Sequence, residues 1–159
     1  MPVIGIISKN ENIIEIEENL IKYGINEKNI IIINEQNIAN VCNVKFDILI
    51  IYEEITTTNV LKDIINNTKY IILNNDFKNN LVLDNNYEVY VITYGFNSKS
   101  TIMIISNEND EIILEIQREI EDLQKRKIDV QEIKFEKKLS KKHIYEEIAF
   151  KILTILLKL

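Results

Sequence analysis

Short apolar runs alternate with segments of helical periodicity over the first part of the chain, from residue 3 to residue 95. This alternation predicts strands joined by helices, and hence a mostly parallel β-sheet. Runs rich in β-branched and aromatic residues mark the expected strands, at residues 3–7, 30–33, 46–52, 70–73 and 90–94. The run at 46–52 is apolar without alternation, which is typical of a strand covered on both faces, so we expect it near the centre of the sheet.

Helical spacing of apolar residues predicts the segments between these strands. The first helix is expected to end near Gly24, since glycine is common just after a helix. A short, weak helix is expected over residues 36–42. A further helix begins after Thr58, a good N-cap residue, and ends at residues 66–67. A short apolar patch at 81–83 stands alone in polar sequence. The apolar positions are Ile13, Ile16, Leu20 and Ile21 in the first helix and Val60, Leu61, Ile64 and Ile65 in the helix after Thr58.

From residue 100 onward, extended runs follow one another without helices between them. This pattern predicts antiparallel strands added at one edge of the sheet. Residues 101–105 and 111–116 predict one hairpin, and residues 111–120 and 128–135 predict a second. A helix over the stretch that starts at residue 111 and ends at residue 127 is the competing interpretation, because acidic residues precede basic ones there in the order that favours helices.

The chain ends in a predicted helix over residues 141–157, with Ser140 as its N-cap. Its apolar face is wide and includes Ile144, Ile148, Ile152, Ile155 and Leu156. Such a helix either packs on the sheet or is shared with a second subunit. Nothing in the sequence marks a domain boundary, so residues 1–159 are interpreted as a single α/β domain. The expected architecture is a three-layer Rossmann-like sheet, mostly parallel, with antiparallel strands at one edge and the C-terminal helix packed on it.

The acidic composition narrows the range of partners. A net charge of −6 disfavours nucleic acid, because phosphate neutralisation requires clustered lysine and arginine. The basic clusters at 125–127 and 137–142 are interpreted as solvated turns. No apolar run approaches the roughly 18 residues of a membrane span. Cys42 alone can form neither an internal disulfide nor a cysteine-based zinc site. These features predict a cytoplasmic protein with no membrane or nucleic-acid partner.

Motif-like residues follow several of the predicted strands. Glu53 and Glu54 follow the third strand, an Asn-Asn-Asp segment at 74–76 follows the fourth, and a Tyr-Gly pair at 94–95 ends the fifth. In this order the segments resemble the central domain of the Mur ligase family, the ATP-dependent amide-bond-forming enzymes of peptidoglycan synthesis. The resemblance implies that Glu53 or Glu54 stands near the family's magnesium-binding glutamate. It likewise aligns 74–76 with an Asn-x-Asp-Asp segment and 94–95 with a Tyr/Phe-Gly motif.

The ATP-binding loop of that family has no counterpart here. Where the family has a Gly-rich loop with Gly-Lys-Ser/Thr, residues 8–12 read Ser-Lys-Asn-Glu-Asn. The final helix resembles the family's adenine-contacting segment, but Lys142, His143 and Glu146 replace its His and Asn residues. The family's two flanking domains are also expected to be missing. The resemblance therefore implies a degenerate P-loop scaffold, a pseudoenzyme without catalytic residues, metal or cofactor. A flavodoxin-like domain would give the same alternation of strands and helices.

A crevice at the carboxyl ends of the parallel strands is the candidate site, since α/β sheets bind ligands there. His143 is interpreted as exposed and inert, and Cys42 as a small apolar filler with no base to activate it. The candidate ligand-binding residues are Ser8, Lys9, Asn10, Glu53, Asn74 and Asp76.

Two functions are consistent with this pattern. The leading hypothesis is a non-catalytic, Mur-ligase-like protein that acts through protein contacts, with a role in cell-wall metabolism implied by the resemblance. Self-association as a homo-oligomer would use the wide C-terminal helix or an exposed edge of the antiparallel strands. The alternative is a module that binds a nucleotide or a UDP-sugar in the strand-end crevice.

Overall fold

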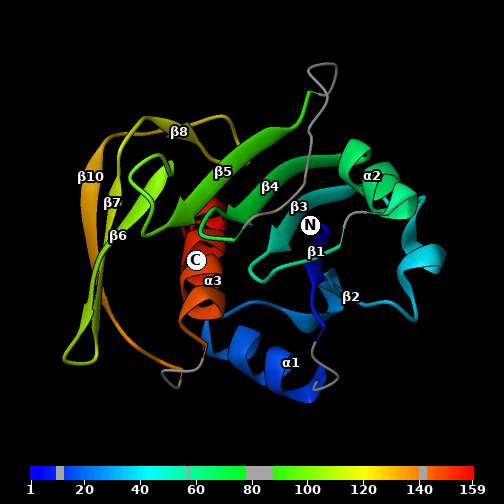
Figure 1. Cartoon of the computed structure of the whole chain (residues 1–159), viewed down its shortest axis with the longest axis horizontal. Helices are drawn as coiled ribbons and strands as arrows, with labels where there is room; N and C mark the ends of the chain where they lie inside the picture. Colours follow the sequence, from blue (N-terminus) through cyan, green and yellow to red (C-terminus); the bar gives the residue numbers. More distant parts are fainter. Residues whose placement is uncertain (10–12, 57, 78–87, 140–142) are drawn as a thin grey trace.

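An eight-stranded sheet forms the middle of the computed structural model, which describes all residues except 10–12, 57, 78–87 and 140–142 (Figure 1). Its strand order is β10-β7-β6-β5-β4-β3-β1-β2, and a separate two-stranded hairpin contains β8 and β9. The strands are β1 (Ile4–Ile7), β2 (Ile30–Ile33), β3 (Phe46–Ile51), β4 (Thr68–Asn74), β5 (Tyr90–Gly95), β6 (Ile102–Glu108), β7 (Glu111–Ile116), β8 (Ile120–Glu121), β9 (Lys127–Ile128) and β10 (Gln131–Glu136).

The first five strands pair in parallel, in the order β2-β1-β3-β4-β5. Each of the five predicted strands is confirmed. Runs rich in β-branched and aromatic residues mark all five, and β1, β3 and β4 are buried along most of their length. This order is that of flavodoxin-like sheets, in which the chain leaves β1 in one direction to form β2 and returns on the other side to form β3.

Helices cover the two faces of the sheet and complete three layers. Helices α1 (Ile13–Lys22) and α3 (Ile144–Leu157) pack on one face, in an apolar cluster that includes Leu20 and Phe150. Helix α2 (Asn59–Asn66) packs on the other face through Leu61, Ile64 and Ile65. The predicted cap of α2 is confirmed, because the Thr58 Oγ1 accepts a hydrogen bond of 3.2 Å from the Leu61 N–H. No helix in the described ranges has the length and apolar character to cross a membrane.

Two short 3₁₀ turns, η1 (Glu27–Asn29) and η2 (Ile38–Val41), flank β2. The weak helix predicted at 36–42 is therefore only a single turn. The helix does not extend because asparagine side chains take the place of backbone hydrogen-bond partners. The Asn34 N–H donates to the Asn37 Oδ1, and the Asn37 side-chain amide donates to the Ile32 carbonyl. The apolar patch predicted at 81–83 lies outside the described residues.

The segment after residue 100 forms the antiparallel part of the sheet. Strands β6 and β7 make a hairpin whose turn residues Asn109 and Asp110 have φ values of 49° and 59°, as a type I′ turn requires. Strand β10 then pairs with β7. The competing helix over residues 111–127 is wrong, because Ile112, Leu114 and Ile116 are buried alternately with exposed or half-buried neighbours, a period of two that only a strand can place on one face.

The two parts of the sheet meet at a short junction between β5 and β6. These strands run parallel but share only two residue pairs, Tyr94 with Ile102 and Gly95 with Met103. The Thr101 N–H donates to the Thr93 Oγ1 at 2.9 Å and ties the intervening loop to β5. Strand β6 therefore continues the sheet beyond the end of β5 and does not lie along it.

Helix α3 begins at Ile144, three residues later than predicted, and its predicted cap Ser140 lies outside the described residues. Its wide apolar face is buried inside this chain: Ile148, Phe150 and Ile152 are all fully buried. The expected packing of the helix on the sheet is thus observed. The largest side chains of this face are therefore used by the packing on the sheet, and self-association through the helix stays a prediction.

Gly5 in β1 leaves room for its neighbours. A Cβ at this position would lie 2.9 Å from Leu49 and from Phe46, both buried. We therefore expect Gly5→Ala to overpack the core and to lower the free energy of unfolding by about 1–3 kcal/mol. Urea denaturation followed by circular dichroism measures the change, and an unaltered midpoint would show that the ring of Phe46 moves aside freely.

Candidate functional site

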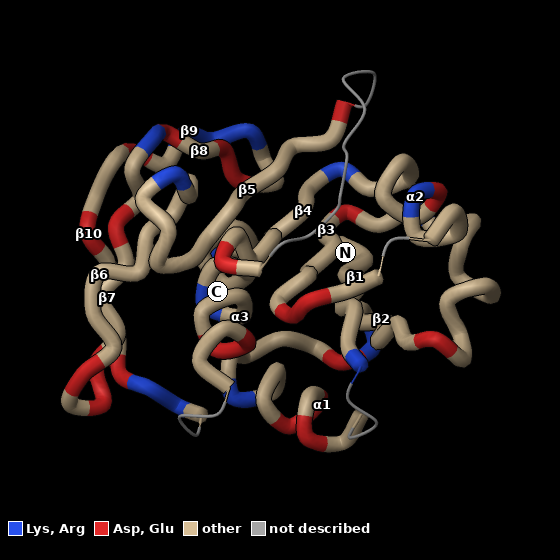
Figure 2. Tube along the Cα trace, in the orientation of Figure 1, with Lys and Arg blue, Asp and Glu red and all other residues tan. Residues whose placement is uncertain are grey.

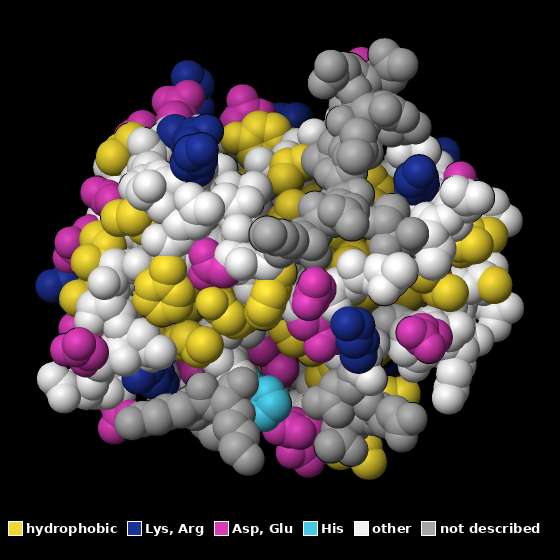
Figure 3. Space-filling model, viewed as in Figure 1, with side chains coloured by type: hydrophobic (Ala, Val, Ile, Leu, Met, Phe, Trp, Pro, Cys, Tyr) yellow, Lys and Arg dark blue, Asp and Glu magenta, His cyan; other side chains and the backbone are white. Residues whose placement is uncertain are grey.

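The edge at which the sequence predicts a crevice is formed where β1 and β3 end side by side, at the point where the strand order reverses. Ser8 and Lys9 follow β1 directly, Tyr52 and Glu53 follow β3, and Asn74 ends β4. Figure 3 shows this face, with hydrophobic and acidic side chains gathered next to one another. The structure thus brings the predicted residues to one edge of the sheet, apart from Asn10, which lies outside the described residues.

Polar groups at this edge are bonded mainly to one another. The Tyr52 hydroxyl donates to the Ser8 Oγ at 2.9 Å, and the Asn74 amide donates to the Tyr52 carbonyl at 3.0 Å. The Lys9 N–H donates to the Glu53 carboxylate. Burial raises the pKa of the Tyr52 hydroxyl well above its usual range, so it stays protonated and acts as a donor. These contacts tie β1, β3 and β4 together at their ends.

Asp76 joins the two segments that carried the most motif-like residues. Its carboxylate accepts hydrogen bonds from the Phe96 N–H at 2.8 Å and the Asn97 N–H at 3.0 Å, and from the Tyr145 hydroxyl at 3.0 Å. Burial, together with the hydrogen bond to Asp76 and its charge, raises the pKa of Tyr145 to about 12. Gly95 lets the carboxylate come this close, because a Cβ there would lie 2.5 Å from the Asp76 Oδ1.

A second group of charges lies between α1 and α3. His143 is only about one-quarter exposed, and its Nε2 lies 3.2 Å from a Glu15 oxygen and its Nδ1 3.4 Å from a Glu146 oxygen. The Asn19 amide donates to Glu146 at 3.0 Å. Burial raises the pKa of the Glu146 carboxyl, with Asn19 and His143 opposing the effect. The histidine that the sequence predicts to be exposed is therefore only partly so, because it pairs with Glu15 of α1 and with Glu146 in the first turn of α3.

Glu147, the next residue, is also buried, and its carboxylate binds the backbone of the segment that leads into α3. Its carboxylate accepts from the Tyr23 hydroxyl at 2.9 Å and from the Leu139 N–H at 3.0 Å, and also from the Lys138 N–H. The sequence pattern alone does not indicate that Glu146 and Glu147 are buried. The available signal was Asn19, a polar residue on the otherwise apolar side of the first helix, where a buried partner is needed.

Three aromatic rings form an open cluster beside Asp76. The ring of Tyr145 lies 5.5 Å from that of Phe77 and 6.5 Å from that of Phe96, both in edge-to-face geometry. Phe96 is 49% exposed, which is unusual for so large an apolar side chain. We refer to Phe77, Phe96 and Tyr145 as the aromatic cluster.

Acidic side chains dominate the surroundings of the cluster and the crevice. Glu15, Glu53, Asp76 and Glu146 belong to this edge, and Figure 2 shows acidic residues on α1, at the start of α3 and after β3. In the part of the chain that the structure describes, no group of three or more His, Cys, Asp or Glu side chains could hold a metal ion. Carboxylates repel a phosphate through their like charge, so a surface that carries several of them favours cationic or apolar groups.

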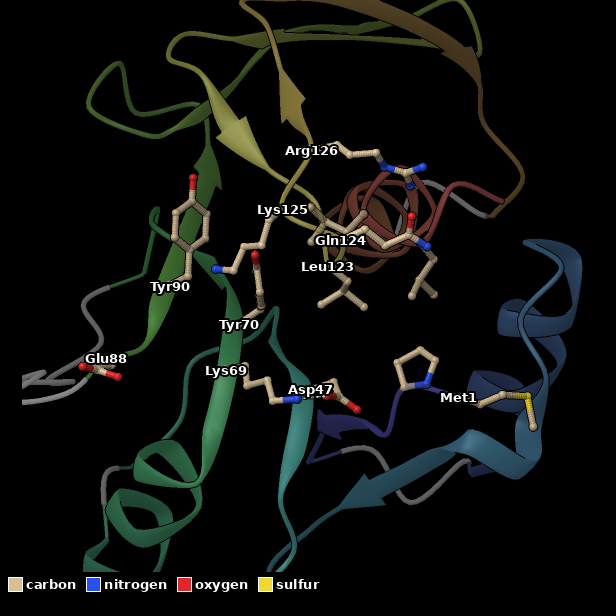
Figure 4. Close-up of a pocket in the computed structure, with 13 residues that line it drawn as sticks. Met1, Asp47, Lys69, Tyr70, Glu88, Tyr90, Leu123, Gln124, Lys125 and Arg126 are labelled. Carbon is tan, nitrogen blue, oxygen red and sulfur yellow. Dashed lines mark hydrogen bonds and ion pairs between the residues drawn. The ribbon is translucent and has the colours of Figure 1, made fainter.

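A pocket of about 660 Å³ lies at the opposite, amino end of the strands (Figure 4). Its walls come from the strand starts, from the turn between β8 and β9, and from the last turn of α3. Sequence reasoning missed this site, although Lys125 and Arg126 of its rim had been noted as part of a basic cluster and interpreted as a solvated turn. The lining residues are Met1, Pro2, Asp47, Lys69, Tyr70, Glu88, Tyr90, Leu123, Gln124, Lys125, Arg126, Leu156 and Leu157.

No protein-family model matches the chain, and a search of curated proteins found no significant match. The similarity to the Mur ligase central domain therefore stays a prediction from the sequence.

The contact between Gly95 and Asp76 can be tested with two glycine variants. Gly95 has a φ of 154° and faces the Asp76 carboxylate, whereas Gly24 has a φ of 76° and faces open space. We expect Gly95→Ala to lower the free energy of unfolding by about 2 kcal/mol or more. Gly24→Ala should lower it by only about 1 kcal/mol, through the strain of its backbone conformation. Equal losses in urea denaturation would show that Asp76 does not require the glycine.

Glu146 gives a prediction about pH. Its pKa is raised in the folded state, so the folded chain binds this proton more readily than the unfolded chain, and the ionised form costs stability. Glu146→Gln should therefore raise the melting temperature at about pH 7, and this gain should shrink as the pH falls toward about pH 5. Glu147→Gln is the contrast: an amide nitrogen would face one of the three donors, so we expect lower stability at both pH values. A gain for Glu146→Gln that is independent of pH would contradict the assignment.

Proposed function

We propose that this chain is a non-catalytic binding domain that acts through contacts with another protein, and that the aromatic cluster with its acidic surroundings is the contact surface. The observation that carries the proposal is the exposure of the cluster, with Phe96 about half accessible beside half-buried Phe77 and Tyr145. Large aromatic side chains that remain accessible in a folded domain are typical of the centres of protein interfaces.

The cluster is held in place before any partner arrives. The Asp76 carboxylate accepts a hydrogen bond from the Tyr145 hydroxyl, and the Tyr94 hydroxyl donates one to the Tyr145 carbonyl at 2.8 Å. The backbone N–H groups of Phe96 and Asn97 are bound to the same Asp76 carboxylate. A surface fixed in this way loses little conformational entropy on binding, so more of the contact energy contributes to affinity.

Charge indicates the kind of partner. The carboxylates of Glu53, Glu54 and Asp76 lie at the strand ends that border the cluster, and the chain as a whole carries a net charge of −6. A partner segment with basic side chains around an apolar or aromatic centre would match this surface, and its association would weaken as salt increases.

The same charges argue against the alternative of a nucleotide or UDP-sugar ligand. Phosphate sites present backbone N–H groups or cations, whereas here the Lys9, Phe96 and Asn97 N–H groups already donate to carboxylates. A cytoplasmic location and a link to cell-wall metabolism belong to the proposal: the first rests on the lone cysteine and on the absence of a long apolar run in the sequence, and the second on the sequence resemblance alone.

Phe96→Ser tests the contact surface, with Ile105→Ser as a matched control. Ile105 is 46% exposed on β6, so both changes remove a half-exposed apolar side chain. Peptides selected from a displayed random library on the wild-type chain should be rich in lysine or arginine around an aromatic residue. Phe96→Ser should weaken their binding about tenfold in fluorescence anisotropy, whereas Ile105→Ser should leave it unchanged.

Two results would contradict the proposal. One is equal loss of peptide affinity for both variants, which would place binding elsewhere. The other is saturable heat in calorimetric titration of the wild-type chain with ATP or UDP-N-acetylmuramic acid in the presence of magnesium, which would support the small-ligand alternative.

Glu54→Gln, at an exposed position, should reduce the salt dependence of peptide binding.

A further inference from the structure

The pocket at the amino ends of the strands has features that the proposed function does not use. We propose that it is a separate binding site for a small aromatic anion, that is, a flat apolar body that carries one carboxylate or phosphate group. Its volume of about 660 Å³ is in the range of small-molecule sites in proteins. It lies at the opposite end of the strands from the aromatic cluster, so the two proposals stand independently.

The walls of the pocket supply apolar surface for the body of such a ligand. Leu123 from the turn and Leu156 and Leu157 from α3 line one side. The rings of Tyr70 and Tyr90 lie 5.1 Å apart on the other side, tilted by 49°. Tyr70 is only 3% exposed and Lys125 lies over its ring, so the half-buried Tyr90 provides the accessible ring. Transfer of a flat molecule from water onto this ring and the leucine side chains is favoured by the hydrophobic effect.

Cations on the pocket wall supply the partner for the anionic group. Three basic side chains, Lys69, Lys125 and Arg126, line the pocket against the two carboxylates of Asp47 and Glu88. The lining is therefore net positive in a chain whose overall charge is −6. Figure 4 shows Lys69 and Lys125 on either side of Tyr70, so an anionic group in the pocket can pair with one or the other of these ammonium groups.

The ammonium groups are accessible to a ligand. Lys125 Nζ lies 5.5 Å from the Tyr70 ring centre and 3.6 Å from a Glu121 oxygen, and its side chain is 69% exposed. Lys69 Nζ lies 2.7 Å from an Asp47 oxygen and its side chain is 71% exposed. Ion pairs with so much solvent contact contribute little to stability, so a ligand anion can share or displace them.

The turn that closes the pocket is fixed by a buried carboxylate. Asp122 is fully buried, and its oxygens accept from the Gln124 N–H at 2.8 Å, the Arg126 N–H at 3.0 Å and the Arg126 Nε at 2.7 Å. The Tyr70 hydroxyl donates to the Asp122 carbonyl at 3.0 Å. The pocket wall is thus attached to β4 and exists without a ligand, as a preorganised site requires.

Fluorescence of 8-anilinonaphthalene-1-sulfonate, an aromatic anion, tests the site directly, with the uncharged N-phenyl-1-naphthylamine as the control ligand. Lys125→Gln and, separately, Lys69→Gln should each raise the dissociation constant of the anion by about threefold or more. Neither should alter binding of the uncharged compound. Lys127→Gln is the matched control, since Lys127 is next to the turn but pairs with Glu119 at 2.9 Å and does not line the pocket.

Amide chemical shifts locate the bound probe. Saturable shifts at residues 123–126 and 156–157 are expected, and displacement by 2-naphthoate or by 2-naphthyl phosphate distinguishes a carboxylate from a phosphate ligand. Shifts centred on the aromatic cluster, equal effects of Lys125→Gln and Lys127→Gln, or the absence of saturable binding would each overturn the proposal. None of these results bears on the peptide experiment, because Phe96 and its neighbours are not part of this pocket.

Discussion

The packing of α3 along one face of the sheet is the contact on which both ends of the molecule depend. Its first turn brings Tyr145 to Asp76 and Glu146 to His143. Its last turn places Leu156 and Leu157 in the amino-end pocket. Between these turns the helix buries a run of large apolar side chains, each worth about 1.5–3 kcal/mol relative to exposure. The free energy that fixes the two candidate surfaces thus comes from the core between them.

Most of the fold could be predicted from the sequence, because runs such as 30–33 and 46–52 are too short for buried helices and too apolar for loops. The parallel strands, the antiparallel hairpin and the final helix are all confirmed. Local competition explains the main miss at 36–42, where Asn34 and Asn37 bond to the backbone and leave only a 3₁₀ turn. Periodicity does not report such bonds, since it registers only which side of an element is apolar.

The candidate site was less predictable, because its contacts join residues far apart in the chain. The sequence predicts that the polar strand ends lie at one edge, but it does not identify Tyr145 as the partner of Asp76, or Glu146 as the buried partner that Asn19 requires. The burial of Glu146 and the enclosure of His143 depend on how α1 and α3 meet, which is a property of tertiary packing. The basic turn at 125–126 was seen as a charge cluster, and only the fold places it over the strand starts next to Lys69.

The two-pair junction between β5 and β6 has a consequence for how this architecture can vary. Other neighbours in the sheet share between four and six residue pairs, so main-chain hydrogen bonding is weakest at this one point. The antiparallel strands are held to the rest mainly by side chains that pack against α3 and the adjacent apolar face. A change in the length of the loop between β5 and β6 therefore need not shift the register of the parallel strands. The junction separates a parallel half, whose register is set by its own strand pairs, from an antiparallel half that is joined to it mainly through side-chain packing.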